Sequence, residues 1–353
     1  MKKWIGIGAL ALCAALLAAL PLAKTGAGAL SSKTALAEKK SGESFSIQQT
    51  AAGAYTGQLS DKLSTVSGID IMCSPNGIAA MPDGSLLVSD TYNKLIRIVK
   101  NGKSSVYAGG ETVTDLYGQP LGGYNDAGMQ TSYFSEPWAI APFLGGWAVS
   151  DAENGAVRLI RTETVETVNG KNIKKKSTKD SPLTFKRPTG LAADGQGNLY
   201  VADTLAGTIS VIAPDGSAST LASGLSAPMG LCWQENALYV AEAGANRIIR
   251  IADGKTSLVA GSGTAALTDG SAKQAAFSSP QGITAGENGV LYVSDTGNSA
   301  IRKISGGEVT TLIASDKSQM SFGLTSPAGL LAQGNKLYIC DPFSRKLFVL
   351  SLG

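Results

Sequence analysis

Short apolar runs separated by turn residues recur along the chain, and residues 280–304 show the pattern most clearly. In and just after that stretch, short apolar segments are divided by Gly, Asp and Asn. Strands of this length joined by turns of such residues are typical of consecutive β-hairpins. The pattern predicts four short strands, at residues 282–285, 290–294, 300–304 and 309–313.

The same unit occurs six times, and each copy has a proline followed 14 or 15 positions later by an acidic residue. The second predicted strand is almost wholly apolar, as at residues 86–88 and 238–240, which indicates a strand covered on both faces. A repeat spacing of roughly fifty residues lies in the range of propeller blades. We therefore predict an all-β fold, a six-bladed β-propeller of four-stranded blades. The anchor pairs are Pro75 and Asp90, Pro137 and Asp151, Pro188 and Asp203, Pro228 and Glu242, Pro280 and Asp295, and Pro327 and Asp341.

The two ends of the repeat region indicate how the ring closes. Residues 45–53 resemble the end of a unit, as at 106–109 and 258–261, whereas the last unit stops after residues 347–350. Closing the last blade with an N-terminal strand removes two free sheet edges, which would otherwise favour aggregation. We predict that a strand within residues 45–53 completes the last blade.

The N-terminus has the composition of an export signal. Lys2 and Lys3 precede an apolar run at residues 4–23, and residues 35–37 (Ala-Leu-Ala) provide a small-residue cleavage site. This arrangement predicts a signal peptide at 1–37, a flexible lead-in at 38–44 and the propeller at 45–353. Since about 20 apolar residues can span a bilayer, an uncleaved anchor is the alternative. In both cases we expect a protein that is secreted or associated with the cell envelope.

The charge balance argues against nucleic acid as a partner. The chain carries 30 basic and 27 acidic side chains, but four of the lysines lie in residues 1–37, which contain no acid. The remainder therefore has 26 basic and 27 acidic side chains and no global positive field to attract phosphates. We expect a monomer whose only membrane contact would be through an uncleaved leader.

A motif within each unit resembles a known repeat. Residues 280–302 contain proline, then Gly-Ile, an apolar strand, Ser-Asp-Thr-x-Asn and Ile-Arg. This pattern resembles the NHL repeat over about residues 45–353, and the chain is similar to exported bacterial members of that family. The resemblance is strongest in the first, fourth and fifth copies. It is weaker in the second (Ala139 for glycine), the third (Ser210 for arginine) and the sixth (Pro342 and Phe343 after the acid). It implies a six-bladed β-propeller that most often serves as a binding platform, although a fold alone does not determine function.

The recurring acids suggest a ring of metal ligands at first sight. A residue required once per blade more readily serves a feature that every blade has, here the turn after the second strand. An Asp in such a turn accepts hydrogen bonds from backbone N–H groups two residues on. Glu242 has one extra residue after it, which we expect to reshape its turn. Arginines of the third strand are expected to pair with these carboxylates, namely Arg97, Arg158, Arg250 and Arg302.

Residues that differ between copies are better candidates for function. The position after each proline begins the innermost strand, at the mouth of the central channel. Its occupants are neutral and include one large aromatic and two amides, which suits stacking and hydrogen bonding to a neutral ligand such as a sugar or peptide. The alternative is that they merely fill the channel. The candidate ligand-binding residues are Asn76, Trp138, Thr189, Met229 and Gln281, and Ala328 occupies the sixth position.

The long connections between blades form a second candidate surface. With four strands per blade they lie on the same face as the turns after the second strands, a face that we call the loop face. Long loops on a rigid scaffold are where binding often resides. The connection at residues 111–136 carries Tyr117, Tyr124 and Tyr133. The connection at 170–187 is basic, which suits an anionic polymer or a lipid headgroup, or else makes it only a solvated loop. Its first lysines are Lys171, Lys174, Lys175 and Lys176.

The chain contains no histidine, which excludes several mechanisms. A Ser-His-Asp triad cannot be built, nor can the histidine-dependent sites of the amidating lyases and streptogramin lyases that resemble this family. Cys73, Cys232 and Cys340 lack the paired spacing of a zinc site, although a Cys73–Cys340 disulfide is one alternative. Calcium is the one cofactor that stays open, in a lactonase-type site of carboxylates and amides. Glu136 is the carboxylate nearest the channel mouth, and Arg187 is placed to neutralise it.

These patterns predict an exported, non-catalytic binding or scaffold module without a cofactor. Its partner would be a protein or glycan of the cell envelope, held by the loop face and the channel mouth. The alternative is a calcium-dependent lactonase or esterase.

Overall fold

A computed structural model describes residues 47–49, 55–57, 62–66, 72–111, 113–170, 183–315 and 323–352. The chain divides into two units, residues 1–41 and 42–353, and all of the described residues belong to the second. The predicted leader and lead-in, at 1–37 and 38–44, lie outside the described residues.

Six antiparallel sheets follow one another along the chain, as the repeat predicts. In five of them the innermost strand begins at the anchor proline, and in the sixth it begins at Leu330, just after Pro327. From the innermost strand outwards, the first sheet contains β4 (Pro75–Ala80), β5 (Leu86–Asp90), β6 (Leu95–Lys100) and β7 (Lys103–Ala108). The second contains β9 (Pro137–Phe143), β10 (Gly146–Asp151), β11 (Ala156–Ile160), β12 (Thr164–Gly170) and β8 (Ala127–Gly128). The third contains β13 (Pro188–Ala193), β14 (Leu199–Asp203), β15 (Thr208–Ile212) and β16 (Ala218–Ala222).

The last three sheets repeat this order. The fourth contains β17 (Pro228–Gln234), β18 (Ala237–Glu242), β19 (Arg247–Ala252) and β20 (Lys255–Ala260). The fifth contains β22 (Pro280–Ala285), β23 (Leu291–Asp295), β24 (Ala300–Ser305), β25 (Glu308–Ala314) and β21 (Gly270–Ser271). The sixth contains β26 (Leu330–Gln333), β27 (Lys336–Asp341), β28 (Lys346–Ser351) and β3 (Leu63–Thr65). Two 3-10 turns, η1 (Ala243–Ala245) and η2 (Thr296–Asn298), follow the second strands of the fourth and fifth sheets.

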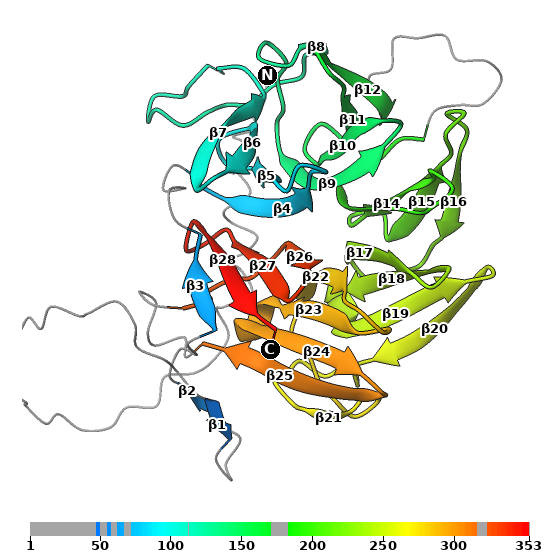
Figure 1. Cartoon of the computed structure of the whole chain (residues 1–353). Helices are drawn as coiled ribbons and strands as arrows, with labels where there is room; N and C mark the ends of the chain where they lie inside the picture. The colour runs from blue at the N-terminus through cyan, green and yellow to red at the C-terminus, as the bar shows by residue number, and fades with distance from the viewer. Residues whose placement is uncertain are drawn as a thin grey trace, which may run out of the picture. The chain divides into compact units, whose positions relative to one another are not determined.

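The innermost strands pack against one another in a closed cycle. β4 contacts β9, β9 contacts β13, β13 contacts β17, β17 contacts β22, β22 contacts β26, and β26 contacts β4 (Figure 1). The six sheets are therefore the blades of a β-propeller, numbered 1 to 6 in chain order, and the predicted fold class is confirmed.

An N-terminal strand completes blade 6, but it is not the predicted one. β3 pairs with β28, with Leu63 opposite Leu350 and Thr65 opposite Phe348. Residues 47–49 (β1) pair instead with residues 55–57 (β2) in a separate hairpin. The prediction for residues 45–53 was therefore wrong. Leu63 supplies the buried side chain that the outer edge of blade 6 needs, because it packs in the apolar cluster between blades 5 and 6.

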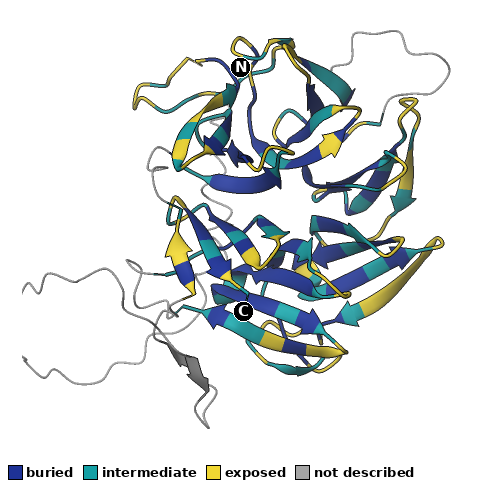
Figure 2. Cartoon of the chain, viewed as in Figure 1, coloured by how far each residue is buried: buried dark blue, intermediate teal, exposed yellow. Residues whose placement is uncertain are grey.

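The core is divided into six apolar clusters, each between two neighbouring blades. β5 shows why its predicted strand is almost wholly apolar. Leu87 packs toward blade 2 and Val88 toward blade 6, and both are fully buried. Each such leucine contributes about 1.5–3 kcal/mol relative to an exposed one. Burial follows the inner strands, while outer strands such as β20 and β3 are largely exposed (Figure 2).

Glycine two positions after the proline lets neighbouring blades approach closely at the channel. A Cβ on Gly282 would lie 1.9 Å from the carbonyl oxygen of Ala328 in blade 6, and one on Gly329 would lie 2.1 Å from that of Asn76 in blade 1. Ala139 is the exception in blade 2, as its sequence indicates.

Candidate functional site

The recurring acid accepts hydrogen bonds from the backbone just before the innermost strand of its own blade. The carboxylate of Asp90 accepts hydrogen bonds from the backbone N–H groups of Cys73 (2.9 Å) and Ser74 (3.2 Å), just before Pro75. It also accepts one from the Asn93 amide at 2.7 Å and pairs with Arg97 at 2.7 Å. We expected the carboxylate to accept hydrogen bonds from the backbone N–H two residues after it. That expectation was wrong, because the carboxylate turns back toward the connection that precedes the blade.

The residues on either side of the acid join its blade to the next one. The hydroxyl of Ser89 donates to the carbonyl of Trp138, and that of Thr91 donates to the carbonyl of Pro137 at 2.5 Å. In blade 5, Ser294 donates to the carbonyl of Ala328 at 2.5 Å. The Ser-Asp-Thr motif thus holds blades together, and these side chains are not free to bind a ligand.

Blade 4 departs from the predicted pairing. The residue four positions after the acid has a positive φ in all six turns, so the turn after Glu242 has the same length as the others and the expectation of a reshaped turn was wrong. The arginine itself is displaced. Arg250 lies opposite Tyr239, on the other face of the sheet from Glu242, and Arg247 pairs with Glu242 at 2.6 Å instead.

The six positions after the prolines lie at the start of the innermost strands or, in blade 6, just before it. Asn76 is buried and donates to Thr91 Oγ1 at 2.9 Å, and the buried Thr189 shares a 2.7 Å hydrogen bond with Thr204. Ala328 is also buried. The three side chains that remain partly exposed are Trp138, Met229 and Gln281.

A charged pair lies beside Trp138. Arg187 Nη2 donates to Glu136 Oε1, as the sequence predicts, and Cζ of Arg187 lies 5.6 Å from the centre of the Trp138 ring. Burial raises the pKa of Glu136, and the Arg187 charge opposes that rise. Nearby, Ser135 donates to the Glu153 carboxylate at 2.6 Å. The arrangement offers an aromatic surface with a paired guanidinium and carboxylate beside it, which suits binding of a polar partner.

The connection before blade 2 contains an ordered hairpin. Thr114 bridges to Pro120, and the Asp115 carboxylate accepts the N–H groups of Tyr117 (2.8 Å) and Gln119 (2.9 Å). Leu116 at its tip is fully exposed and Tyr117 is 85% exposed. We call residues 113–121 the tip hairpin.

The other two tyrosines of this connection are structural. The Tyr124 hydroxyl hydrogen-bonds to Thr167 at 2.7 Å, and its ring faces the guanidinium of Arg158 at 4.9 Å. The carbonyl of Tyr133 accepts a 2.8 Å hydrogen bond from the same guanidinium. Of the three predicted tyrosines, only Tyr117 extends fully into solvent.

The predicted basic residues Lys171, Lys174, Lys175 and Lys176 lie outside the described residues.

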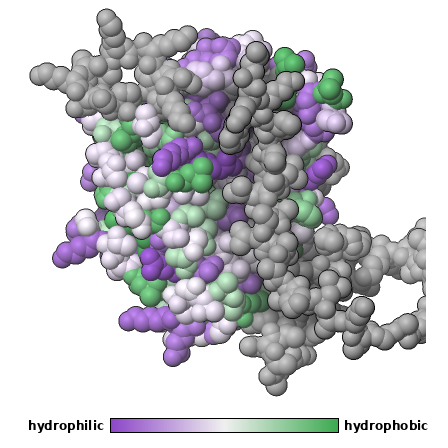
Figure 3. Space-filling model, turned by 180° about the vertical axis from the view of Figure 1, so that it is seen from behind, coloured by the Kyte–Doolittle hydropathy of each residue, from purple (hydrophilic) through white to green (hydrophobic). Residues whose placement is uncertain are grey.

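In the described part of the face seen from behind, apolar residues form small groups among polar ones (Figure 3).

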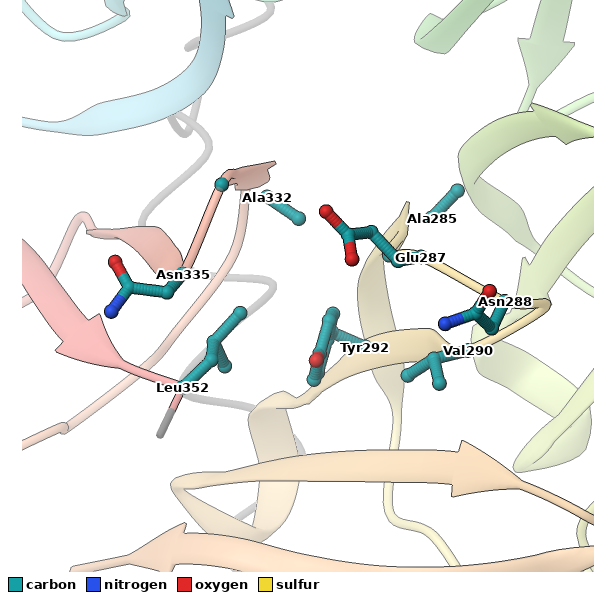
Figure 4. Close-up of a pocket in the computed structure, with 10 residues that line it drawn as sticks. Ala285, Glu287, Asn288, Val290, Tyr292, Ala332, Asn335 and Leu352 are labelled. Atoms are coloured by element: carbon teal, nitrogen blue, oxygen red, sulfur yellow. The ribbon is translucent and has the colours of Figure 1, made fainter.

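A cleft that the repeat pattern does not indicate lies on the opposite face, between the first hairpins of blades 5 and 6. It has a volume of about 400 Å³ and is lined by Tyr292, Val290, Leu352, Glu287, Asn288 and Asn335, among others (Figure 4). We call it the hairpin-face cleft. Its one sequence signal is Gly286, where a Cβ would lie 2.7 Å from the Tyr292 ring. Blade 3 has Asp194 at this position, and that carboxylate accepts a 3.0 Å hydrogen bond from Tyr200.

The comparisons with known proteins agree with the fold and the motif. The NHL repeat model matches residues 72–99 and 277–304, which are the first and fifth units. Human NHL repeat-containing protein 2 is 29% identical over 290 residues, covering 65% of this chain and 38% of the relative. This chain contains NHL repeats in a six-bladed β-propeller. It spans well under half the length of that relative.

Solved structures share the propeller fold with this NHL-repeat chain. An auxiliary nutrient binding protein from Bacteroides thetaiotaomicron superposes with a TM-score of 0.60 at 14% identity, over 86% of this chain and 81% of that protein. A gluconolactonase from Xanthomonas campestris superposes with a TM-score of 0.60 at 16% identity, over 88% of this chain and 95% of that enzyme. At these identities the likeness is one of fold.

The donors at the mouth of this NHL propeller do not fit a calcium ion. Calcium takes about six to eight oxygen ligands. The Glu136 carboxylate is paired with Arg187. Side-chain oxygens at the ring positions come from Asn76, Thr189 and Gln281, and the side chains of Asn76 and Thr189 are hydrogen-bonded to Thr91 and Thr204. Within the described ranges, no three His, Cys, Asp or Glu side chains are grouped for a metal.

The cysteines of the NHL propeller are free thiols. Cys73, Cys232 and Cys340 form no disulfide, so the alternative Cys73–Cys340 bridge is absent from the described fold. Burial raises the pKa of Cys232 to about 12 and raises that of Cys340 further, so neither thiol forms a thiolate near neutral pH.

Among the described residues, no helix is long and apolar enough to cross a membrane.

Proposed function

We propose that this NHL propeller is a non-catalytic binding module that holds a protein or glycan partner of the cell envelope through its loop face and channel mouth. The tip hairpin is the observation that carries the proposal. Leu116 and Tyr117 are the two most exposed large apolar side chains among the described residues. Asp115 holds their backbone in place before any partner arrives. A pre-ordered loop with apolar side chains at its tip binds at a lower entropic cost than a flexible one.

The channel mouth provides the second contact. The connection that contains the tip hairpin leads directly into β9 and Trp138. Trp, Tyr and Arg are the residues that most often dominate binding energy at interfaces. Trp138 with Arg187 beside it, and Tyr117 at the hairpin tip, supply all three types on one face.

Charge narrows the chemistry of the partner. Residues 111–136 contain four acidic side chains and no lysine or arginine. Two of them are paired within the chain, Asp126 with Arg158 and Glu136 with Arg187. Glu111 and Asp115 therefore carry the negative charge at and beside the tip hairpin. A partner surface with an apolar pocket and a basic rim complements these two, whereas a like-charged surface is disfavoured. The acidic residues are Glu111, Asp115, Asp126 and Glu136.

The basic connection after blade 2 adds a further contact in this proposal. Lys171, Lys174, Lys175 and Lys176 would meet an anionic polymer or headgroup of the envelope. The leader at residues 1–37 supports export of a monomer to the envelope or beyond it.

Catalysis is not part of the proposal. The likeness to a gluconolactonase is one of fold, and the donor set at the channel mouth does not fit calcium.

The test uses the full chain, immobilised, with envelope proteins and glycans as candidate partners. The variants are Leu116→Ser, Tyr117→Ser and Trp138→Ala. The matched control is Leu258→Ser, an exposed leucine on β20. We expect loss of Tyr117 or Trp138 to weaken retention by about 30-fold, because truncating a hot-spot aromatic costs about 2 kcal/mol or more. The control should bind like the parent chain. Equal retention by all four variants would place the partner elsewhere, and turnover of lactones or esters by the purified chain would overturn the non-catalytic assignment.

A further inference from the structure

We propose that the hairpin-face cleft binds a single neutral sugar ring. This site is separate from the loop face, so it goes beyond the proposed function and does not depend on it.

The cleft has the size and the rigidity of a ligand site. Small-molecule sites have volumes of about 300–1,000 Å³, and this cleft has about 400 Å³. One wall is the turn after β22, closed by hydrogen bonds from Gly286 N–H to Val290 O (2.8 Å) and from Val290 N–H to Glu287 O (3.1 Å). The other wall is the turn before β27, where Leu352 N–H donates to Asn335 O at 2.8 Å. Both walls are therefore formed before a ligand arrives.

The lining has two kinds of surface. The Tyr292 ring, Val290 and Leu352 form an apolar side, and Glu287 presents a carboxylate from one wall (Figure 4). Asn335 belongs to the opposite wall, and its amide lies at the rim, turned away from Tyr292 in this view. A pyranose ring also has two kinds of surface, an apolar C–H face and an edge of hydroxyls. The aromatic ring matches the first. The carboxylate accepts from hydroxyls, and the amide both donates and accepts.

The charge of the lining selects against other ligands. Glu287 is the one charged residue among the residues that line the cleft, and no basic side chain is among them. A phosphate or an acidic sugar would meet a like charge with nothing to neutralise it. An apolar ligand would contact only the side formed by Tyr292, Val290 and Leu352 and would gain nothing from Glu287 and Asn335. A neutral polyol satisfies both sides of the cleft.

Gly286 creates the space. The Tyr292 ring lies against the Gly286 backbone, where a Cβ would approach it to 2.7 Å. The equivalent positions of blades 1 and 3 are occupied by Met81 and Asp194. A side chain at residue 286 would therefore push the aromatic ring into the cleft.

The experiment titrates the full chain with neutral monosaccharides (glucose, galactose, mannose and N-acetylglucosamine) and with tetramethylammonium. Binding is followed by ligand-observed NMR and by calorimetry. Glu287→Ala and Asn335→Ala alter exposed side chains, so they should not disturb folding. Gln196→Ala, in the corresponding hairpin of blade 3, is the matched control.

We expect at least one sugar to bind, and each cleft variant to weaken it by about tenfold or more, because each removes hydrogen bonds to the hydroxyls. The control should bind it like the parent chain. Four results would overturn the proposal. The first three are no binding by any sugar in the panel, binding that the two cleft variants leave unchanged, and binding of tetramethylammonium but not of sugars. The fourth is loss of sugar binding in Trp138→Ala, which would place the sugar at the channel mouth.

Discussion

Arg302 shows how a single repeated residue organises its surroundings. Its guanidinium is fully buried and pairs with Asp295 at 2.7 Å and with Asp269 at 2.8 Å. It also donates to the carbonyls of Ala276 and Thr268. Asp269 comes from the long connection before blade 5, so the arginine ties that connection to the blade. Arg158 repeats the arrangement in blade 2.

The first prediction at this scale concerns the acid. Asp295→Ala leaves the Arg302 charge buried with one of its two carboxylates missing. Removing one partner of a buried pair typically costs about 3–5 kcal/mol, and we expect the free energy of unfolding to fall by about that amount. The measurement is urea unfolding of both chains. Glu308→Ala, at an exposed position of β25 in the same blade, is the control and should unfold like the parent chain. An unchanged midpoint in Asp295→Ala would mean that the pair contributes nothing to stability.

The sequence predicted the structural role of the repeated acid, but it did not predict which groups the carboxylate bonds to. Recurrence alone indicates that Asp90 and its equivalents serve a structural feature. The actual bonds, to Cys73 and Ser74, connect residues 16 and 17 positions apart. Local turn chemistry does not report such bonds, because they depend on where the preceding connection runs. The displacement of Arg250 to the other face is visible only once the register of β18 and β19 is known.

At the scale of elements, the positions of the inner strands can be predicted from the local sequence. The strand that closes the ring cannot. Proline, glycine and an apolar run fix where an inner strand begins, and the predicted strands of the fifth unit overlap β22 to β25 closely. β3 has three residues, Leu-Ser-Thr, which carry no periodic signal. Residues 45–53 resemble a unit end in composition, but pairing with β28 and burial of Leu63 decide which segment closes the ring.

The hairpin-face cleft is a second element that the repeat does not predict. It requires the turns of two different blades side by side, together with a glycine at residue 286. Neither turn contains a motif on its own. Comparing the six copies reveals that residue 286 lacks a side chain, but not that a neighbouring blade leaves the space open.

Truncation distinguishes the two candidate closing strands. A chain that begins at residue 59 keeps β3, whereas one that begins at residue 67 loses it together with the buried Leu63. We expect the first to melt like the full chain. The second should lose at least about 2 kcal/mol, because a buried leucine and its strand pairing are removed. Thermal unfolding of the two truncated chains measures the difference. Equal destabilisation in both would return the closing role to residues 45–53.

At the scale of the whole molecule, the ring separates two faces, and the two proposals assign them to different ligands. The Ser-Asp-Thr hydrogen bonds occupy the polar side chains of the inner turns, so in the proposed function the loop face would bind through the connections inserted between blades. On the opposite face, the hairpin-face cleft lies where residue 286 has no side chain. A rigid ring lets each face change its contacts without altering the other, and this is why the Trp138 and Glu287 variants are expected to act independently.

The ring itself depends on close approach of the inner strands, and Gly282 tests that dependence. A methyl group at this position would lie 1.9 Å from the carbonyl oxygen of Ala328 in blade 6, so Gly282→Ala forces the two blades apart. Overpacking of this kind typically costs about 1–3 kcal/mol. Gly195→Ala is the matched control, because a Cβ there has no neighbour within 4 Å and the backbone does not require a positive φ. Calorimetric melting of both variants should show a lower Tm for Gly282→Ala alone. Equal melting temperatures would mean that blades 5 and 6 are spaced widely enough at the channel to accept a side chain, as blade 2 does at Ala139.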